Sequence, residues 1–404
     1  MLAAALLGFA GTTVASNLFA ASYSGLVTSL SLTASNDTYH LDSTFESGEC
    51  GPDPSWLTID SNRGLLFCLN EGIEYPNGSL SSFTINSDGS LNHVQNTTTI
   101  WGPVSAQIYG SATGRRGIAL AHYLGSAVTT WLLDGGGRFH LNQEIPYTLD
   151  EPGPNAERQD APHEHEAILD PTGQYILVPD LAADLVRVLA IDPETLKLTP
   201  KTPLQVPAGY GPRHGVFYSP YSVACESCTT FFYLVTELAS TVEGYQVHYL
   251  PDNGGLEFES IYSSNTRGPF DTDRVNAPAE IQISPDNRFL VISNRNDSSF
   301  SLPNTASGND TRIPSDSLST FELSQTGELK FVQLWPAGGG FPRHFSLNLA
   351  GDLLAVGLQS DGIVRVLARD VATGLIGEPI ASLDGLGGVS AVVWNDGPGR
   401  VSGH

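Results

Sequence analysis

The sequence predicts an all-β protein folded as a seven-bladed β-propeller. Short apolar runs rich in Val, Ile, Leu and Phe alternate with turns, which is typical of buried strands. No window of about a dozen residues shows a helical hydrophobic period. One unit also recurs seven times along the chain, and a recurring unit of this kind indicates one blade per repeat.

Each recurring unit starts with proline or glycine, continues into an alternating apolar strand and ends in a turn. The gaps between successive starts range from roughly 46 to 66 residues, the scale of one four-stranded blade. The seven starts are Pro54–Leu57, Pro103–Ala106, Pro162–His165, Pro212–Gly215, Pro278–Ile281, Pro342–Phe345 and Gly388–Ala391.

A second apolar run follows each of the first six starts and ends in a polar residue. These runs are Leu65–Glu71, Ile118–His122, Tyr175–Asp180, Phe231–Glu237, Phe289–Arg295 and Leu353–Gln359. The seventh start has no full blade behind it, whereas the N-terminal part supplies the strands Leu18–Tyr23 and Leu26–Leu32. We therefore expect N- and C-terminal strands to share one blade, which closes the ring and removes exposed sheet edges.

The chain is expected to form one propeller domain, residues 17–404, after a signal peptide, residues 1–16. The segment Met1–Ala15 is apolar, too short to span a bilayer, and ends in small residues suited to cleavage. This pattern predicts a secreted protein. Sequons at Asn36, Asn77, Asn96 and Asn309 are candidate glycosylation sites.

Four cysteines fall into two close pairs. Cys50 and Cys68 flank the first start and can form a disulfide in an oxidising compartment. Cys225 and Cys228 form a C-x-x-C motif, for which we expect a disulfide within a loop. A zinc site would need further ligands and a redox site a helix N-terminus, and neither is visible.

The formal net charge is −24, from 19 Lys and Arg against 43 Asp and Glu. This charge makes nucleic acid and anionic membranes poor partners. Against it, Arg213, Arg295 and Arg343 stand at the polar ends of the repeats, which suits a small anionic substrate because a guanidinium binds carboxylates in a bidentate way.

Two strands joined by a turn run antiparallel, so the start of the first and the end of the second lie at one rim. Innermost strands of different blades line the axis of a propeller, so these residues are expected to converge on one mouth. The starts contribute His163, Glu164, His165, Arg213, His214, Glu280, Arg343 and His344, and the run ends contribute Glu71, His122, Asp180, Glu237, Arg295 and Gln359.

Four segments carry a resemblance to a known family. They are APHEH from Ala161 with the following LDPTGQYILVPDL, GPRH from Gly211, VTELAST from Val235 and APAEIQISPDNRFLVISNR from Ala277. The chain resembles the seven-bladed β-propeller lactonase family, which groups bacterial 6-phosphogluconolactonases with fungal 3-carboxy-cis,cis-muconate lactonising enzymes. The resemblance implies an enzyme, and we expect it to be closest to the carboxymuconate cyclases of aromatic degradation.

The resemblance implies a catalytic set of His165, Arg213, Glu237 and Arg295. We expect the two arginines to bind substrate carboxylates and stabilise an enolate-like intermediate, while His165 and Glu237 transfer the proton. Expected substrate-binding residues are His163, His214, Arg343, His344 and Asp180. No metal and no cofactor is expected.

Structural roles compete with these assignments. Arg213 and Arg343 can tie neighbouring blades together, and Glu237 can be only their ion-pair partner. Three functions therefore remain: an isomerase that closes a lactone on an unsaturated polycarboxylate, a hydrolase that opens a sugar lactone, and a secreted propeller that binds ligands without catalysis. Arginines at the mouth of the propeller axis favour catalysis over a non-catalytic role. Their desolvation costs free energy, and a scaffold would gain nothing in return.

Overall fold

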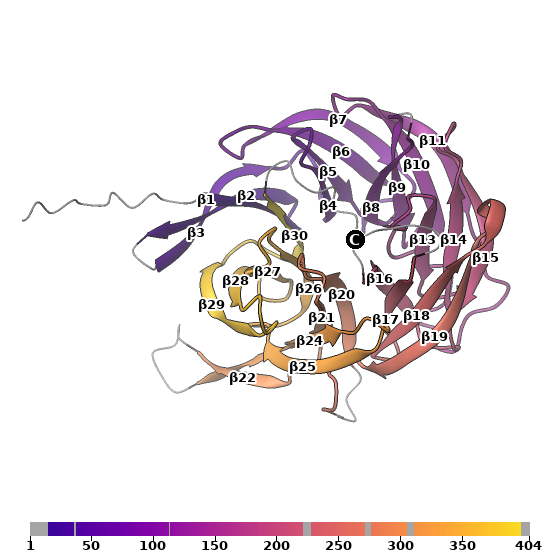
Figure 1. The fold of residues 1–404 in the computed structure, drawn as a ribbon. Coiled ribbons are helices and arrows are strands. Elements are labelled where there is room, and N and C mark those ends of the chain that lie inside the picture. The colour runs from indigo at the N-terminus through magenta and orange to yellow at the C-terminus, as the bar shows by residue number, and fades with distance from the viewer. Residues whose placement is uncertain are drawn as a thin grey trace, which may run out of the picture.

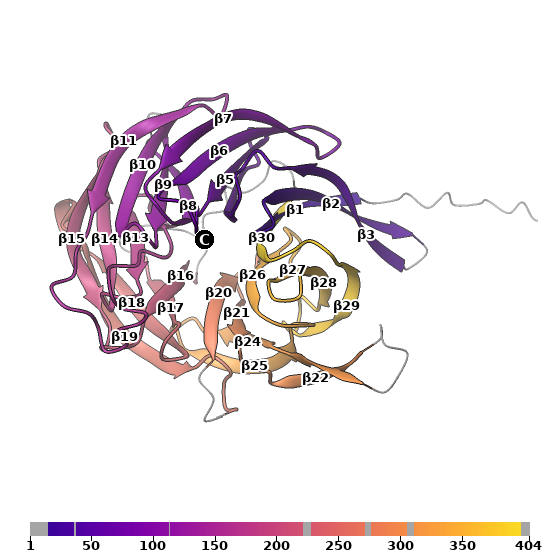
Figure 2. The ribbon, with the colours of Figure 1, turned by 180° about the vertical axis from the view of Figure 1, so that it is seen from behind.

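The computed structural model describes residues 15–35, 38–112, 114–220, 228–270, 276–304 and 311–396. Seven four-stranded antiparallel sheets stand around one axis as the blades of a propeller (Figures 1 and 2). The predicted fold class is confirmed.

The strands are numbered in chain order and occupy equivalent places in each blade. The innermost strands are β4 (Pro54–Asp60), β8 (Pro103–Gly110), β12 (Ile168–Leu169), β16 (Pro212–Tyr218), β20 (Ala277–Ile283), β26 (Pro342–Leu347) and β30 (Val389–Asn395). The second strands are β5 (Leu65–Asn70), β9 (Arg116–His122), β13 (Tyr175–Asp180), β17 (Thr230–Thr236), β21 (Phe289–Arg295), β27 (Leu353–Leu358) and β1 (Ala15–Ser22).

The third strands are β6 (Gly78–Ile85), β10 (Ala127–Leu133), β14 (Leu185–Ile191), β18 (Thr241–Tyr249), β24 (Ser317–Leu323), β28 (Ile363–Arg369) and β2 (Leu26–Ser35). The outermost strands are β7 (Leu91–Thr99), β11 (Phe139–Pro146), β15 (Leu198–Gln205), β19 (Leu256–Asn265), β25 (Leu329–Pro336), β29 (Ile376–Leu383) and β3 (Thr38–Ser47). An additional hairpin, β22 (Phe300–Pro303) and β23 (Arg312–Ser315), and one 3₁₀ turn, Pro251–Asn253, complete the described elements.

The last blade is built from both ends of the chain. Strand β1 pairs with β30, from Asn17 opposite Asn395 to Ser22 opposite Val389, and with β2 on its other side. The predicted closure is therefore confirmed. Because β1 begins at Ala15, the last two residues of the predicted signal segment lie in a strand, while residues 1–14 lie outside the described residues.

Packing between blades explains why the apolar runs are not interrupted by exposed polar residues. The second strands β5, β13, β17 and β21 are buried along their whole length, because each blade face is covered by a neighbouring blade. The buried apolar side chains form seven clusters, one between each pair of adjacent blades around the ring. The core is thus a closed series of sheet-on-sheet interfaces.

Two disulfide predictions have different outcomes. Cys50 and Cys68 are joined by a disulfide with a Cα–Cα distance of 5.9 Å, as predicted. Cys228 is disulfide-bonded, and its predicted partner Cys225 lies outside the described residues.

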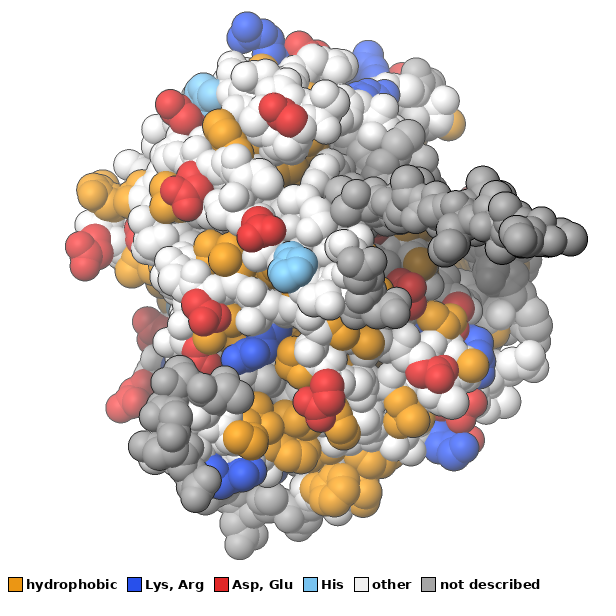
Figure 3. All heavy atoms as spheres, turned by 90° about the vertical axis from the view of Figure 1, so that its left-hand side faces the viewer, with side chains coloured by type: hydrophobic (Ala, Val, Ile, Leu, Met, Phe, Trp, Pro, Cys, Tyr) orange, Lys and Arg blue, Asp and Glu red, His pale blue; other side chains and the backbone are white. Residues whose placement is uncertain are grey.

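Figure 3 shows acidic side chains scattered over the side of the molecule that carries β3 and β22, in keeping with the net charge of −24. In the described part of the chain, no helix has the length and apolar character needed to cross a membrane.

Candidate active site

A β-bulge lies at the start of six of the seven innermost strands. In β16, for example, Pro212 pairs with Thr236 and His214 pairs with Val235, so Arg213 is the extra residue. In β26 the extra residue is Arg343. Such bulges re-aim a side chain out of the regular alternation. We call the face of the ring at which the innermost strands start the upper face, and the face at which they end the lower face.

The sequence before Arg213 explains how the strand reaches this position. Gly211 has φ of +63°, and a Cβ there would stand 2.5 Å from Cγ of Leu238, so glycine is required. Its N–H donates to Asp184 at 2.8 Å, and its carbonyl accepts the N–H of Glu237 at 2.8 Å. The loop before β16 and the end of β17 are thereby held together, which brings Arg213 beside Glu237.

Glu237 is the centre of a buried ion cluster on the upper face. Nε of Arg213 and Nη2 of Arg295 both lie 2.8 Å from its Oε2. Arg213 also donates to the carbonyl of Ala279 at 2.6 Å, and Arg295 to that of Ala277 at 2.9 Å. Arg213, Glu237 and Arg295 are 1%, 4% and 4% exposed. The cluster ties the blade of β16 to the blade of β20.

Arg158 is a member of this cluster that sequence reasoning missed. It lies between β11 and β12, and its Nη2 donates to Oε1 of Glu237 at 2.7 Å and lies 3.4 Å from the Tyr123 hydroxyl. Its side chain is 41% exposed, so it can contact a ligand from solvent. Arg158 stands outside the recurring unit, and no repeat position signals it.

The arginines determine the ionisation of Glu237. Burial alone would raise the pKa of this carboxyl, but the charges of Arg295, Arg213 and Arg158 outweigh burial and hold its pKa well below the ordinary value. Glu237 is therefore a carboxylate throughout the neutral range. A group held in this way is a weak proton acceptor, and the geometry favours a role in orienting the arginines.

A second arginine-containing group borders the cluster. The guanidinium of Arg343 lies 5.6 Å from the ring centre of Tyr23, whose hydroxyl donates to Glu71 at 2.6 Å. Arg343 is half-buried, whereas its neighbours Arg213 and Arg295 are enclosed. The upper end of the axis thus has four arginines around two buried carboxylates, in a protein with a large negative net charge.

His165 lies beside this cluster and is 6% exposed. Burial, together with the charges of Arg213, Arg343 and Arg295, lowers its pKa well below the ordinary value, so the imidazole is neutral. Its Nδ1 lies 3.1 Å from Nε2 of His214. Among the described residues, Nε2 of His165 has no hydrogen-bond partner, so this nitrogen is available to a ligand.

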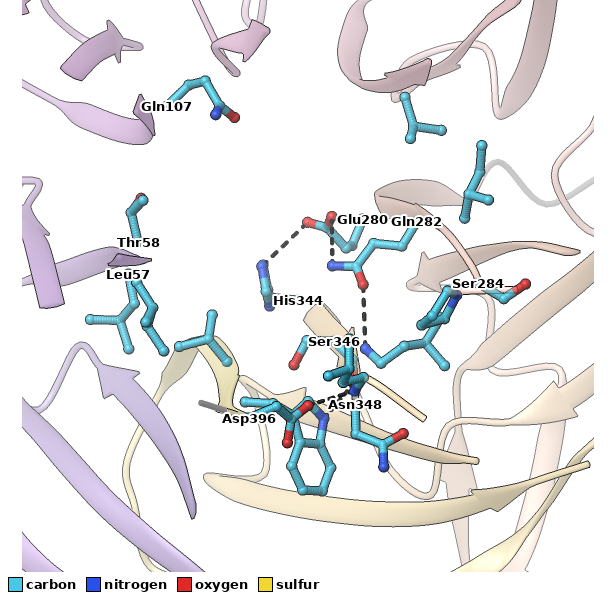
Figure 4. A pocket seen from close by; sticks show the side chains of 18 of the residues that line it. Leu57, Thr58, Gln107, Glu280, Gln282, Ser284, His344, Ser346, Asn348 and Asp396 are labelled. Carbon is cyan, nitrogen blue, oxygen red and sulfur yellow. Dashed lines mark hydrogen bonds and ion pairs between the residues drawn. The ribbon is translucent and has the colours of Figure 1, made fainter. Parts of the chain in front are cut away.

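His214 continues this contact along the axis. Its Nδ1 lies 3.1 Å from Oε2 of Glu280, and Nε2 of His344 lies 3.6 Å from the same oxygen. The N–H of Val392 donates to Nδ1 of His344 at 3.3 Å, so Nδ1 is an acceptor and Nε2, which faces Glu280, carries the ring proton. Figure 4 shows His344 and Gln282 directed toward the carboxyl group of Glu280.

Below this group the axis widens into a cavity of about 490 Å³. Glu280, Glu166 and His344 line its inner end, and Leu349, which is 44% exposed, lies in its lining on the lower face. None of His165, Arg213, Glu237 and Arg295 lines this cavity, and its described lining has neither Lys nor Arg. The two ends of the axis therefore differ in charge.

Two predicted substrate-binding residues have their polar atoms engaged elsewhere. Asp180 is fully buried, pairs with Arg187 and accepts the backbone N–H groups of His163, Ala182 and Ala183. Its position favours a structural role. His163 stacks on Tyr123 with ring centres 4.1 Å apart, and its two nitrogens contact the Tyr123 carbonyl and Asp160.

The other predicted site residues come together along the axis. His165, His214 and His344 follow one another from the arginine cluster toward the cavity. His165 lies in the irregular segment before β12, where the described residues form the isolated bridge Glu164–Asp180 and no regular strand. Within the described ranges, no group of three or more His, Cys, Asp or Glu side chains could hold a metal ion.

Comparison with known proteins agrees with this architecture. Residues 13–393 match the family described as "Lactonase, 7-bladed beta-propeller". The chain is 29% identical over 326 residues, 80% of its own length and 75% of the relative's, to "Probable 6-phosphogluconolactonase" of Arthroderma benhamiae. It is 26% identical over 324 residues to the 6-phosphogluconolactonase of Formosa agariphila, with coverages of 79% and 82%.

Among solved structures, the periplasmic gluconolactonase of Pseudomonas aeruginosa superposes with a TM-score of 0.75 at 23% identity, covering 94% of this chain and 99% of that one. A protein from Lactobacillus plantarum superposes with a TM-score of 0.76 at 20% identity, with coverages of 94% and 99%. At these identities the structures show that the fold is shared.

Proposed function

Because the chain belongs to the seven-bladed β-propeller lactonase family, we propose that it hydrolyses the lactone of an acidic sugar at the upper end of the propeller axis. The expectation that the chain is closest to the fungal carboxymuconate cyclases finds no support in the comparisons, in which 6-phosphogluconolactonases recur. The hydrolase therefore replaces the cyclase as the leading function.

One observation carries this proposal: four arginines and a neutral imidazole, whose Nε2 has no hydrogen-bond partner in the described part of the chain, lie together on the upper face. Arg158 and Arg343 are the accessible cations and are placed to bind a phosphate or carboxylate of the substrate. Arg213 and Arg295 are held by Glu237, and their fixed charge favours the oxyanion that develops on the lactone carbonyl.

His165 supplies the proton transfer that hydrolysis requires. Nε2 accepts a proton from water as its oxygen attacks the lactone carbonyl, and it returns a proton to the ring oxygen when the ester bond breaks. Glu237 does not transfer a proton in this scheme. It neutralises and orients Arg213, Arg295 and Arg158.

Lactone closure on carboxymuconate is the second candidate. The surplus of arginines over carboxylates at the upper face suits a substrate with several carboxylates. The same His165 would deliver a proton to carbon after a carboxylate oxygen adds to the double bond.

A substrate panel tests both functions. Purified protein is mixed with 6-phosphogluconolactone, gluconolactone and carboxymuconate, and acid release and ultraviolet loss of the diene are followed. We expect acid release from the phosphorylated lactone above the uncatalysed rate. Loss of the diene without acid release would favour the cyclase, and no change with any substrate would contradict both.

We further propose that the protein acts outside the cytoplasm. The disulfide between Cys50 and Cys68 supports an oxidising compartment. Of the predicted glycosylation sites, Asn77 and Asn96 are exposed, whereas Asn36 and Asn309 lie outside the described residues. Mass spectrometry of the secreted protein, before and after removal of N-linked glycans, tests this proposal.

A further inference from the structure

The surroundings of His165 create a problem for a simple general base. A base that accepts a proton becomes an imidazolium, and here that cation would lie beside Arg213, Arg295 and Arg343. Like charges in a buried site are unfavourable. His214 alone cannot hold the extra proton as an imidazolium either, because burial and the charge of Arg213 also lower its pKa well below the ordinary value.

Glu280 provides an anion at the other end of the contact series. Its Oε2 lies 3.1 Å from Nδ1 of His214, whose Nε2 lies 3.1 Å from Nδ1 of His165. All three side chains are at least nine-tenths buried. Since each neutral imidazole carries one N–H, this series has two consistent proton arrangements.

In the first arrangement Glu280 is a carboxylate. It accepts Nδ1–H of His214, whose Nε2 accepts Nδ1–H of His165, and Nε2 of His165 is an unprotonated base. In the second arrangement Glu280 is a carboxylic acid. It donates to Nδ1 of His214, whose Nε2–H donates to Nδ1 of His165, and Nε2 of His165 carries a proton and is an acid.

We propose that His165, His214 and Glu280 form a proton relay that converts His165 between base and acid without a charged imidazole. This inference rests on the proposed function of His165. His214 and Glu280 are positioning residues, because they act through His165 and do not touch the substrate.

The relay accounts for each proton that moves during the hydrolysis. When water attacks the lactone carbonyl, its proton goes to Nε2 of His165, Nδ1–H of His165 passes to Nε2 of His214, and Nδ1–H of His214 passes to Glu280. When the ring C–O bond breaks, the alkoxide oxygen takes the proton from Nε2 of His165, and the relay returns to its first arrangement. The acid that is formed releases its own proton to solvent.

The environment of Glu280 suits this exchange. Burial raises its pKa to about 8, although the charge of Arg213 acts in the opposite direction, so both forms are accessible near neutral pH. The titratable groups that face it are Glu166, Arg213, His214 and His344. Glu280 also lines the cavity on the lower face, through which it can exchange a proton with solvent away from the substrate (Figure 4).

The cavity on the lower face differs in charge from the arginine-rich upper face. It has no described Lys or Arg in its lining, so an anionic substrate is favoured at the arginine-rich upper face and the cavity stays open to water. The buried carboxyl of Glu166 stands near Glu280, but it accepts the N–H of Gly215 at 2.7 Å, and among the described residues it makes no hydrogen bond or ion pair with the His214 ring. Glu166 is therefore a matched control for Glu280.

The relay is tested without substrate by nuclear magnetic resonance of protein labelled with ¹⁵N-histidine, from about pH 6 to about pH 10. The spectra report which ring nitrogen carries the proton, and His165→Gln and His214→Gln variants assign the signals. We expect the two tautomers to switch together with a midpoint near pH 8. We expect the switch to be absent in Glu280→Gln and present in Glu166→Gln.

Two results would overturn the relay: tautomers of His165 and His214 that stay constant in the wild-type protein over this range, or a doubly protonated His165 at neutral pH. Because the wild-type spectra decide both, a Glu280→Gln variant that fails to fold does not remove the test. Activity separates the two proposals. A tautomer switch without lactone hydrolysis would contradict the proposed function alone, and hydrolysis without the switch would contradict the relay alone.

Discussion

Nη2 of Arg295 lies 2.8 Å from Oε2 of Glu237, and both side chains are about 95% buried. Glu237 directly follows β17 and Arg295 ends β21, the second strands of neighbouring blades, so the ion pair lies across a blade interface. Arg213 shares the same carboxylate oxygen. The site is therefore also a structural joint, and loss of one of these three buried charges affects stability as well as activity.

Replacement of Glu237 by Gln is expected to lower the free energy of unfolding by about 3–5 kcal/mol, because it leaves Arg213 and Arg295 buried without their anion. Urea denaturation at neutral pH measures this change. Glu322→Gln is the control, since its pair with Lys330 is exposed and is expected to contribute about 1 kcal/mol or less. Equal effects in the two variants would contradict the buried ion cluster.

The same carboxylate predicts how stability depends on pH. The pKa of Glu237 is lower in the folded protein than in the unfolded chain, where a glutamate has a pKa of about 4.3. Its contribution is therefore complete above that value and decreases as the pH falls toward the folded-state pKa. Thermal unfolding between about pH 3 and about pH 7 should show a smaller loss of stability in Glu237→Gln than in the wild-type protein.

Arg158→Gln is expected to raise KM for the phosphorylated lactone about 10-fold, equivalent to about 1.4 kcal/mol of binding. The KM for gluconolactone, which has no phosphate, should rise less. The melting temperature should stay nearly unchanged, because Glu237 keeps its ion pairs with Arg213 and Arg295. Steady-state kinetics with both lactones measure the difference, and Arg138→Gln, an exposed arginine elsewhere, is the control. A similar loss with both lactones would show that Arg158 does not bind the anionic group.

Cys50→Ser is expected to lower the free energy of unfolding by about 3 kcal/mol, because the disulfide closes a loop with a sequence separation of 18 residues. Chemical denaturation with and without a reducing agent measures the effect. The wild-type protein under reducing conditions should approach the variant. An unchanged stability in Cys50→Ser would show that the first blade does not depend on this bond.

Much of the fold could be predicted from sequence because the blade is a short unit that repeats. Proline at the start of an innermost strand and a polar residue after the second strand recur often enough to locate six of the seven blades. The apolar runs are continuous and do not alternate with polar residues, because neighbouring blades cover both faces of each sheet. The blade shared by both termini could be predicted from the unpaired start at Gly388–Ala391 and the unassigned strands after Ala15.

The site was predicted less completely. Arg213, His214, Arg295 and Glu237 stand at repeat positions, so their approach to one axis follows from the fold. Arg158 lies on a connection between blades, where the path of the chain depends on contacts that no local pattern specifies. The pattern also could not show that three arginines hold Glu237 ionised.

Glu280 was recognised as a residue of the rim but was not assigned to the site. Its place between His214 and the lower cavity depends on the bulge in β20, where Pro278 pairs with Asn294 and Ile281 with Ile292. A bulge changes which side chains face the axis, and the sequence does not mark it.

The most direct test of the account is the rate of acid release from 6-phosphogluconolactone by the wild-type protein and by His165→Gln, both shown to be folded by circular dichroism. We predict that kcat falls about 100-fold or more in the variant, because proton transfer by a positioned side chain contributes at least that factor. An unchanged kcat in folded His165→Gln would contradict the assignment of the upper face as the active site.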